Sequence, residues 1–287
     1  MRYFSIFSGI GGFEYGMDQS DYEFECVGYS EINKYARSIY EKHYPNHINF
    51  GDATKINTDE LPNFDFLVGG FPCQAFSIAG KRGGFNDTRG TLFFEIARIL
   101  RDKSPRYFLL ENVKGLLSHD NGRTFKTILE ICDELGYDVS WQVYNSKYYG
   151  VPQNRERVFI KGYFRDKCGR EIFSFRQNKE DNTRVMNGRC VVNGSAYYYP
   201  SSDTLCACIT EGGKHSGGRN FVNVSDGNEY LIRKLTPVEC ERLQAFPDDW
   251  TKWGKDGELI SDTQRYKCCG NAVTTSVITF IINNMFR

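Results

Sequence analysis

Short apolar runs alternate with amphipathic stretches along the first 160 residues. The apolar runs predict buried strands at residues 3–7, 24–31, 64–70, 106–112 and 157–164. The stretches between them carry apolar residues at helical spacing over residues 33–44, 91–101 and 124–135. Strands that alternate with helices predict a mostly parallel sheet covered on both faces. Ligand sites in such sheets lie at the carboxyl ends of the strands.

The pattern changes after residue 165. Residues 166–230 are rich in Gly, Asn, Ser, Arg and Tyr and have weak periodicity, which predicts a small, loop-rich and partly β region. Regular periodicity returns near residue 235. We therefore expect a large α/β domain made of residues 1–165 and 231–287, and a second, small domain made of residues 166–230.

Two helices are expected in the C-terminal part. Thr236 is a good N-cap, Pro237 suits the first helical position and Glu239 lies three residues after the cap, so a helix is predicted through Ala245. A final helix is predicted over residues 272–286.

Charge and cysteine content narrow the class of protein. The 36 basic and 36 acidic residues cancel, although residues 161–234 carry twelve Lys and Arg against eight Asp and Glu, so a nucleic-acid face is compatible with the charge but is not required by it. The ten cysteines form no CxxC pair, and we expect no metal site. No secretory signal and no membrane-length apolar run is evident, which favours a reduced, cytoplasmic setting.

The stretch "FSGIGGFEYG", which begins at Phe7, follows the first predicted strand. Its glycines let the backbone approach a ligand closely, although Gly9, Gly11 and Gly12 depart from the GxGxxG pattern. Glu31 ends the second strand, where an acidic side chain can bind a ribose diol. Asp52 follows a third segment and could reach the amino group of an adenine. The pattern predicts nucleoside recognition and leaves the type of cofactor open.

Cys73 lies in "GGFPCQAFSIAGKRGGF", directly after a strand that ends in two glycines. We expect Cys73 at the edge of the cleft that contains the predicted nucleoside site. A thiolate is a strong nucleophile, and the polar, glycine-rich surroundings of Cys73 favour reaction over burial.

Six motifs occur in one order along the chain, namely "FSGIGGF", "GGFPCQAFS", "ENV", "QNRERVF", "LTPVECERLQAFPDDW" and "GNAV". In this order and spacing the sequence resembles the DNA (cytosine-5) methyltransferases, especially the compact bacterial enzymes of restriction-modification systems. The resemblance covers nearly everything except residues 166–230. It implies a Rossmann-like methyltransferase domain and, for residues 166–230, a target-recognition domain.

The resemblance also implies catalytic roles for four residues. Cys73 matches the cysteine that adds to carbon 6 of cytosine, and Glu111 matches the acid that protonates or hydrogen-bonds ring nitrogen 3. Arg155 and Arg157 match arginines that contact the cytosine and the catalytic loop. Because the two alternate on a predicted strand, both are expected to point to one side.

S-adenosylmethionine is the implied cofactor, with S-adenosylhomocysteine as the product. The residues expected to bind it are Phe7, Gly9, Gly11, Gly12, Glu31, Asp52, Pro72, Leu92, Asn271 and Val273.

Double-stranded DNA is the implied partner, from which the target cytosine must be flipped out. The residues expected to contact it are Lys81, Arg82, Thr204, Gly212, Gly213 and Arg219. We expect a monomer. Any cognate restriction endonuclease is expected to act on the same DNA site without forming a complex with this protein.

Three other interpretations remain open at this point. A tRNA (cytosine-5) methyltransferase shares the motif order, although "KGLLSHDNGRTF" is more similar to the DNA enzymes. A catalytically silent DNA-binding regulator is disfavoured by Cys73, Glu111 and Arg155 together. A nicotinamide dehydrogenase would use the early glycines and Glu31 but leaves "PCQ" and "QNRER" unexplained.

Overall fold

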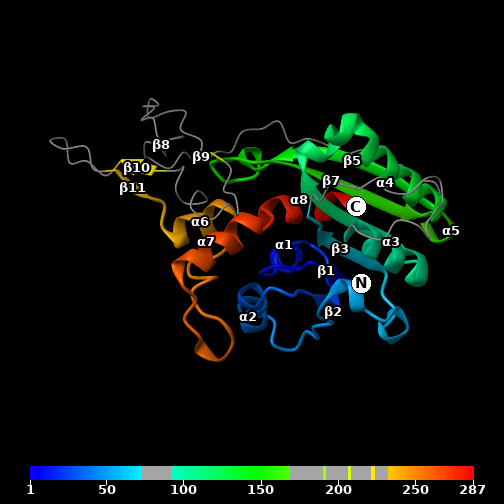
Figure 1. The fold of residues 1–287 in the computed structure, drawn as a ribbon, viewed down its shortest axis with the longest axis horizontal. Coiled ribbons are helices and arrows are strands. Elements are labelled where there is room, and N and C mark those ends of the chain that lie inside the picture. Colours follow the sequence, from blue (N-terminus) through cyan, green and yellow to red (C-terminus); the bar gives the residue numbers. More distant parts are fainter. Residues whose placement is uncertain (73–91, 169–189, 192–205, 208–220, 224–231) are drawn as a thin grey trace.

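The chain folds around a six-stranded sheet with the order β2-β1-β3-β4-β7-β5 (Figure 1). A computed structural model describes residues 1–72, 92–168, 190–191, 206–207, 221–223 and 232–287. The strands of the sheet are β1 (Arg2–Ile6), β2 (Glu25–Ser30), β3 (Phe66–Gly70), β4 (Tyr107–Val113), β5 (Tyr137–Asn145) and β7 (Glu156–Phe164).

Four neighbouring strands run parallel and end at one edge of the sheet. Ile6 of β1 pairs with Ser30 of β2 and with Gly69 of β3, and Gly70 pairs with Glu111 of β4. Strand β7 runs antiparallel to both β4 and β5. The mostly parallel α/β sheet is therefore confirmed.

Helices cover both faces of this sheet (Figure 1). Apolar residues of α3 and α4 share one buried cluster with β1, β3, β4 and β7, whereas α1 and α8 pack on the opposite face. The helices are α1 (Gly12–Asp18), α2 (Lys34–His43), α3 (Leu92–Lys103), α4 (Arg123–Glu134), α5 (Arg165–Cys168), α6 (Pro237–Leu243), α7 (Asp262–Asn271) and α8 (Thr275–Met285). Among the helices of the described ranges, none combines the length and apolarity needed to cross a membrane.

The structure corrects several predicted boundaries. Strand β5 was not predicted, because at the sheet edge its burial is mixed and Trp141 is exposed. Helix α1 begins inside the glycine motif, at Gly12. Helix α7 was not predicted. Helix α6 ends at Leu243 because the backbone of Ala245 is left-handed (φ 60°). Helix α8 begins at Thr275 and not at residue 272, since Ala272 is extended.

The C-terminal half contains several short strands. Strands β8 (Cys190–Val191), β10 (Phe221–Asn223) and β11 (Ile232–Lys234) form a small antiparallel sheet. Strand β9 (Cys206–Ala207) pairs in parallel with β6 (Gln153–Asn154). The predicted capping box of α6 is present, since Thr236 and Glu239 exchange hydrogen bonds with each other's backbone N–H.

A buried carboxyl lies directly behind the glycine turn. Glu14, in the first turn of α1, is fully buried, and Tyr40 of α2 donates a hydrogen bond to its Oε1 at 3.1 Å. The Tyr40 hydroxyl also lies 2.9 Å from Nδ1 of His47. Burial raises the pKa of Glu14 to about 7, because the charged form loses its hydration there.

This buried carboxyl should make the stability of the protein depend on pH. The folded chain holds the Glu14 proton up to about pH 7, whereas the unfolded chain releases it near pH 4.5. The contribution of Glu14 to stability is therefore fully present below pH 4.5 and is lost as the pH rises to about 7. Relative to Glu14→Gln, the free energy of unfolding of the unmodified protein should fall by about 3 kcal/mol across this range. Urea unfolding of both proteins at pH 5 and pH 8 measures the difference, and equal pH dependence would contradict it.

Candidate active site

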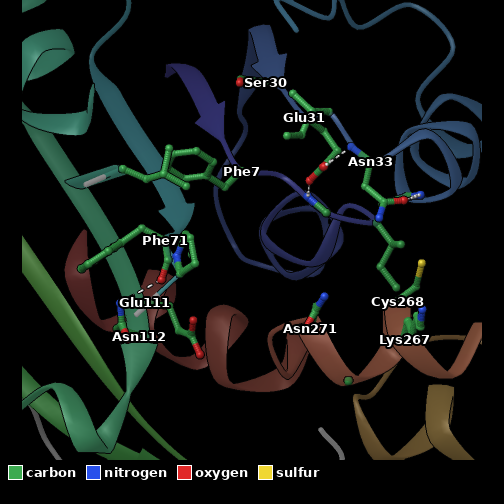
Figure 2. A pocket seen from close by; sticks show the side chains of 18 of the residues that line it. Phe7, Ser30, Glu31, Asn33, Phe71, Glu111, Asn112, Lys267, Cys268 and Asn271 are labelled. Carbon is green, nitrogen blue, oxygen red and sulfur yellow. Dashed lines mark hydrogen bonds between the residues drawn. The ribbon is translucent and has the colours of Figure 1, made fainter. Parts of the chain in front are cut away.

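A cavity of about 630 Å³ opens at the edge where the parallel strands end. Its walls come from segments far apart in the sequence, namely the first glycine turn, the ends of β2, β3 and β4, and α7 (Figure 2). Ten of the predicted site residues line it, and these are Phe7, Gly9, Glu31, Asp52, Pro72, Leu92, Glu111, Arg155, Arg157 and Asn271.

The glycine turn presents one aromatic face to the cavity. Phe7 follows β1 directly and has a left-handed backbone (φ 56°), which is unusual for a bulky residue and is typical of functional sites. Gly11 is also left-handed (φ 86°) and caps α1. A Cβ at Gly11 would lie only 2.9 Å from the Tyr44 ring, so glycine is needed for the turn to pack against α2.

Glu31 ties the ends of two strands together. Its Oε2 accepts a hydrogen bond from the Gly9 N–H at 2.9 Å, and its Oε1 accepts one from the Asn33 N–H at 2.7 Å. Burial raises the pKa of Glu31, and these backbone N–H groups oppose that shift. A carboxylate has about four acceptor positions, so Glu31 can still accept hydrogen bonds from ligand hydroxyls.

Asp52 lies at the outer part of the cavity wall. Its Oδ1 accepts hydrogen bonds from the N–H and the hydroxyl of Thr54, at 3.0 and 2.8 Å. These bonds lower the pKa of Asp52 and keep it an ionised acceptor.

A buried ion pair occupies the other end of the cavity. Glu111 lies near the end of β4 and is 8% exposed, and Nε of Arg157 lies 3.0 Å from its Oε1. Burial raises the pKa of Glu111, although the charges of Arg157 and Arg155 act in the opposite direction. A raised pKa suits a carboxyl that delivers a proton or a hydrogen bond to a ligand.

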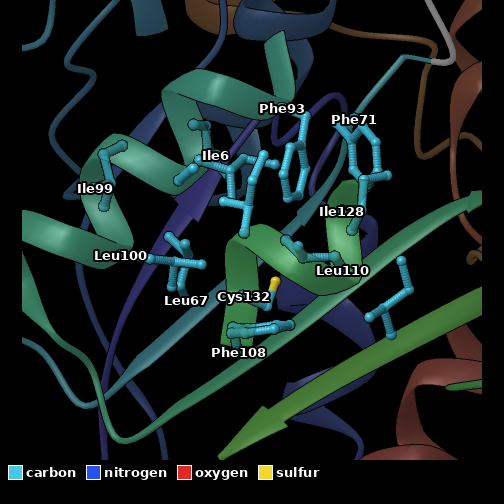
Figure 3. Packing of buried hydrophobic residues seen from close by; sticks show 14 of the residues in the cluster. Ile6, Leu67, Phe71, Phe93, Ile99, Leu100, Phe108, Leu110, Ile128 and Cys132 are labelled. Carbon is cyan, nitrogen blue, oxygen red and sulfur yellow. The ribbon is translucent and has the colours of Figure 1, made fainter. Parts of the chain in front are cut away.

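Asn112, which sequence reasoning passed over, fixes the end of β3. Its Nδ2 donates to the Phe71 carbonyl at 2.8 Å, and its Oδ1 accepts from the Val113 N–H at 2.8 Å. The Phe71 ring packs beside Phe93 in the core beneath the cavity (Figure 3). Asn112 thereby fixes the backbone just before Pro72. Its place in "ENV" was the signal that could have identified it.

Arg155 and Arg157 both line the cavity but bind different partners. Arg155 lies between β6 and β7 and is 2% exposed. Its Nη2 donates to the carbonyls of Gly270 and Ala272, at 3.0 and 2.8 Å, whereas Arg157 faces Glu111. Both side chains line one cavity, and their hydrogen-bond and ion-pair partners differ.

Other predicted residues lie away from the cavity wall or outside the described residues. Gly11, Gly12 and Val273 are absent from the lining, and a Cβ at Gly12 would lie 2.8 Å from Val273, so these two pack together behind the turn. The following lie outside the described residues: Cys73, Lys81, Arg82, Thr204, Gly212, Gly213 and Arg219. Helix α7 adds Gln264, Lys267 and Cys268 to the wall, and these were missed because α7 was not predicted.

Comparison with known structures shows the same architecture. The S. pombe Dnmt2 methyltransferase superposes with a TM-score of 0.73 and 21% identity, covering 99% of this chain and 97% of that one. The Entamoeba histolytica methyltransferase EhMeth gives a TM-score of 0.70 and 21% identity, covering 100% of this chain and 98% of that one. At this identity the likeness concerns the fold alone, which is the Rossmann-like methyltransferase fold.

Sequence comparison is more specific. The Type II methyltransferase M1.ScrFI of Lactococcus lactis subsp. cremoris is 41% identical over 310 residues, which cover 98% of this chain and 77% of that protein. The Type II methyltransferase M.SsoII of Shigella sonnei is also 41% identical and covers 98% of this chain and 78% of its own length. The family model of the C-5 cytosine-specific DNA methylases matches residues 1–191 and 191–287. The chain therefore belongs to the family of C-5 cytosine-specific DNA methylases.

Proposed function

We propose that this protein transfers a methyl group from S-adenosylmethionine to carbon 5 of a flipped-out cytosine in duplex DNA, leaving S-adenosylhomocysteine. One observation supports the proposal most strongly. One end of a single cavity, around Phe7 and Glu31, has side chains that suit the binding of a nucleoside. The other end has the buried Glu111–Arg157 pair. Two substrates bound at these ends would meet within one cavity.

The residues of the first end suit S-adenosylmethionine. Phe7 offers an aromatic face to a purine, Glu31 offers acceptors to ribose hydroxyls, and Asp52 offers an acceptor to an exocyclic amine. Pro72, Leu92 and Asn271 line the same space. When bound, this cofactor supplies an electrophilic methyl group on a sulfonium.

The residues of the second end suit activation of a cytosine. Carbon 5 is a weak nucleophile, so the Cys73 thiolate adds to carbon 6, and the C–S bond converts the ring into a reactive enamine. Glu111 gives a proton or hydrogen bond to nitrogen 3 as negative charge accumulates there, and Arg157 holds Glu111 in place. After the methyl group has moved to carbon 5, a base such as water takes the carbon 5 proton. The electron pair of that C–H bond forms the 5,6 double bond as the C–S bond breaks, so the Cys73 thiolate leaves and the aromatic ring is restored.

The proposed partner is a short duplex site read by residues 166–230 as a separate recognition domain, which includes Thr204, Gly212, Gly213 and Arg219. Lys81 and Arg82 would contact DNA phosphates from the loop after Cys73. We propose a monomer that works in the cytoplasm, as the modification enzyme of a restriction-modification system. Any cognate endonuclease would act on the same site without forming a complex.

Methyl transfer to DNA should depend on Cys73. Purified protein incubated with methyl-tritiated S-adenosylmethionine should label mixed-sequence duplex DNA, and Cys73→Ser should lower the rate by at least about 10³-fold because the carbon 6 adduct cannot form. Total tRNA is the parallel substrate. Label in tRNA alone would reject DNA as the substrate, and equal labelling by Cys73→Ser would reject the covalent mechanism.

Glu111→Gln should reduce the transfer rate in a manner that depends on pH. The amide can donate a hydrogen bond but no acidic proton, so we expect a loss of about 10²- to 10⁴-fold. The protonated fraction of Glu111 falls as the pH rises through its raised pKa, so the rate advantage of the unmodified protein should shrink with increasing pH. Ionisation of Cys73 affects both proteins and cancels in the ratio. A ratio that stays constant between pH 5 and pH 9 would contradict this role.

Glu31→Gln should weaken cofactor binding and leave the chemical step nearly intact. The amide loses charged hydrogen bonds at Gly9 and to the ribose, so KM for S-adenosylmethionine should rise about tenfold while kcat changes little. Glu25→Gln, at the exposed start of β2, is the matched control. A fall in kcat at unchanged KM would show that Glu31 acts elsewhere in the reaction.

A further inference from the structure

Arg155 lines the cavity together with Glu111 and binds the C-terminal end of α7, which forms another part of the cavity wall. Its Nη2 donates to the carbonyls of Gly270 and Ala272, which are the two residues on either side of Asn271. Gly270 and Asn271 both line the cavity, and Figure 2 shows Asn271 at the C-terminal end of α7 beside it. One guanidinium group therefore holds the backbone on both sides of a residue in the cavity wall.

The main chain of Arg155 is itself held by buried hydrogen bonds. The Ser146 N–H donates to the Arg155 carbonyl at 2.9 Å, and the Ser146 hydroxyl lies 2.8 Å from that of Thr274. Thr274 donates to Gln244 at 2.8 Å, and Gln244 donates to the Cys269 carbonyl at 3.1 Å. These bonds reach α7 by a second route, so the position of Arg155 and the end of α7 are fixed relative to each other.

Arg155 and Glu111 line the same cavity. The positive charge of Arg155 lowers the pKa of Glu111 against the effect of burial. Arg157 makes the direct ion pair with Glu111. Arg157 therefore pairs with Glu111, whereas Arg155 binds the backbone at the end of α7.

We propose that Arg155 is a positioning residue for the cofactor site, which fixes Asn271 and the end of α7 by binding the carbonyls on either side of it. The inference rests on the proposed function, in which this wall contacts S-adenosylmethionine. It assigns Arg155 a role in cofactor affinity that a contact with cytosine does not include. Cofactor affinity measured without DNA should therefore depend on Arg155.

The test compares Arg155→Lys with Arg157→Lys. Lysine keeps the charge but cannot reproduce the two hydrogen bonds of the planar guanidinium. By titration calorimetry without DNA, Arg155→Lys should raise the Kd for S-adenosylhomocysteine about tenfold, and Arg157→Lys should leave it within about twofold. In methylation assays Arg155→Lys should mainly raise KM for S-adenosylmethionine, and Arg157→Lys should mainly lower kcat.

A double-mutant cycle separates this specific role of Arg155 from a general loss of folded structure. The effects of Arg155→Lys and Asn271→Ala on Kd should be smaller together than their sum, since both act through Asn271. If Arg155→Lys does not fold, Thr274→Val breaks the second route to α7 and should raise the Kd about threefold. An unchanged Kd in the folded variant, or in Thr274→Val if it is the one that folds, would overturn the proposal. Absence of binding by the unmodified protein would instead reject the proposed function.

Discussion

The register of four parallel strands is the constraint on which the site depends. Because β2, β1, β3 and β4 end at the same edge, Glu31, Phe7, the residues after Gly70, and Glu111 meet there. Phe7 and Glu111 are more than a hundred residues apart in sequence. A shift of one residue in any of these pairings would turn the terminal side chain to the other face of the sheet. The buried clusters on both faces oppose such a shift, so core packing sets the geometry of the cavity.

Electrostatics then distinguishes the two ends of the cavity. At one end, backbone N–H groups hold the Glu31 carboxylate, which suits the recognition of neutral hydroxyls. At the other end, burial and two arginines act on Glu111 in opposite directions, and burial prevails. A carboxyl with a raised pKa suits the proposed site, where a ring nitrogen gains negative charge. The same sheet edge thus carries two carboxyl groups in different electrostatic surroundings.

Much of this arrangement could be predicted from the sequence, because glycine turns and strand ends are local signals. The alternation of strands and helices in the first half of the chain, and the position of Phe7, Glu31 and Glu111 at or near strand ends, followed from such signals. Helix α7 was missed since its apolar residues do not form a clear stripe, and β5 was missed because an edge strand is only partly buried. The partners of Arg155 could not be predicted, because its hydrogen bonds reach carbonyls more than a hundred residues away.

We propose that the cavity brings a cytosine to Cys73, which follows β3 by three residues in the sequence, while the cofactor is bound beside it. Duplex DNA in which 5-fluorocytosine replaces the target base tests it most directly, since fluorine blocks the last proton loss and traps the covalent adduct. Digestion and mass spectrometry should find the nucleotide on the peptide that contains Cys73, and only when S-adenosylmethionine is present. A methylated product without any adduct, or an adduct on a different cysteine, would contradict the account.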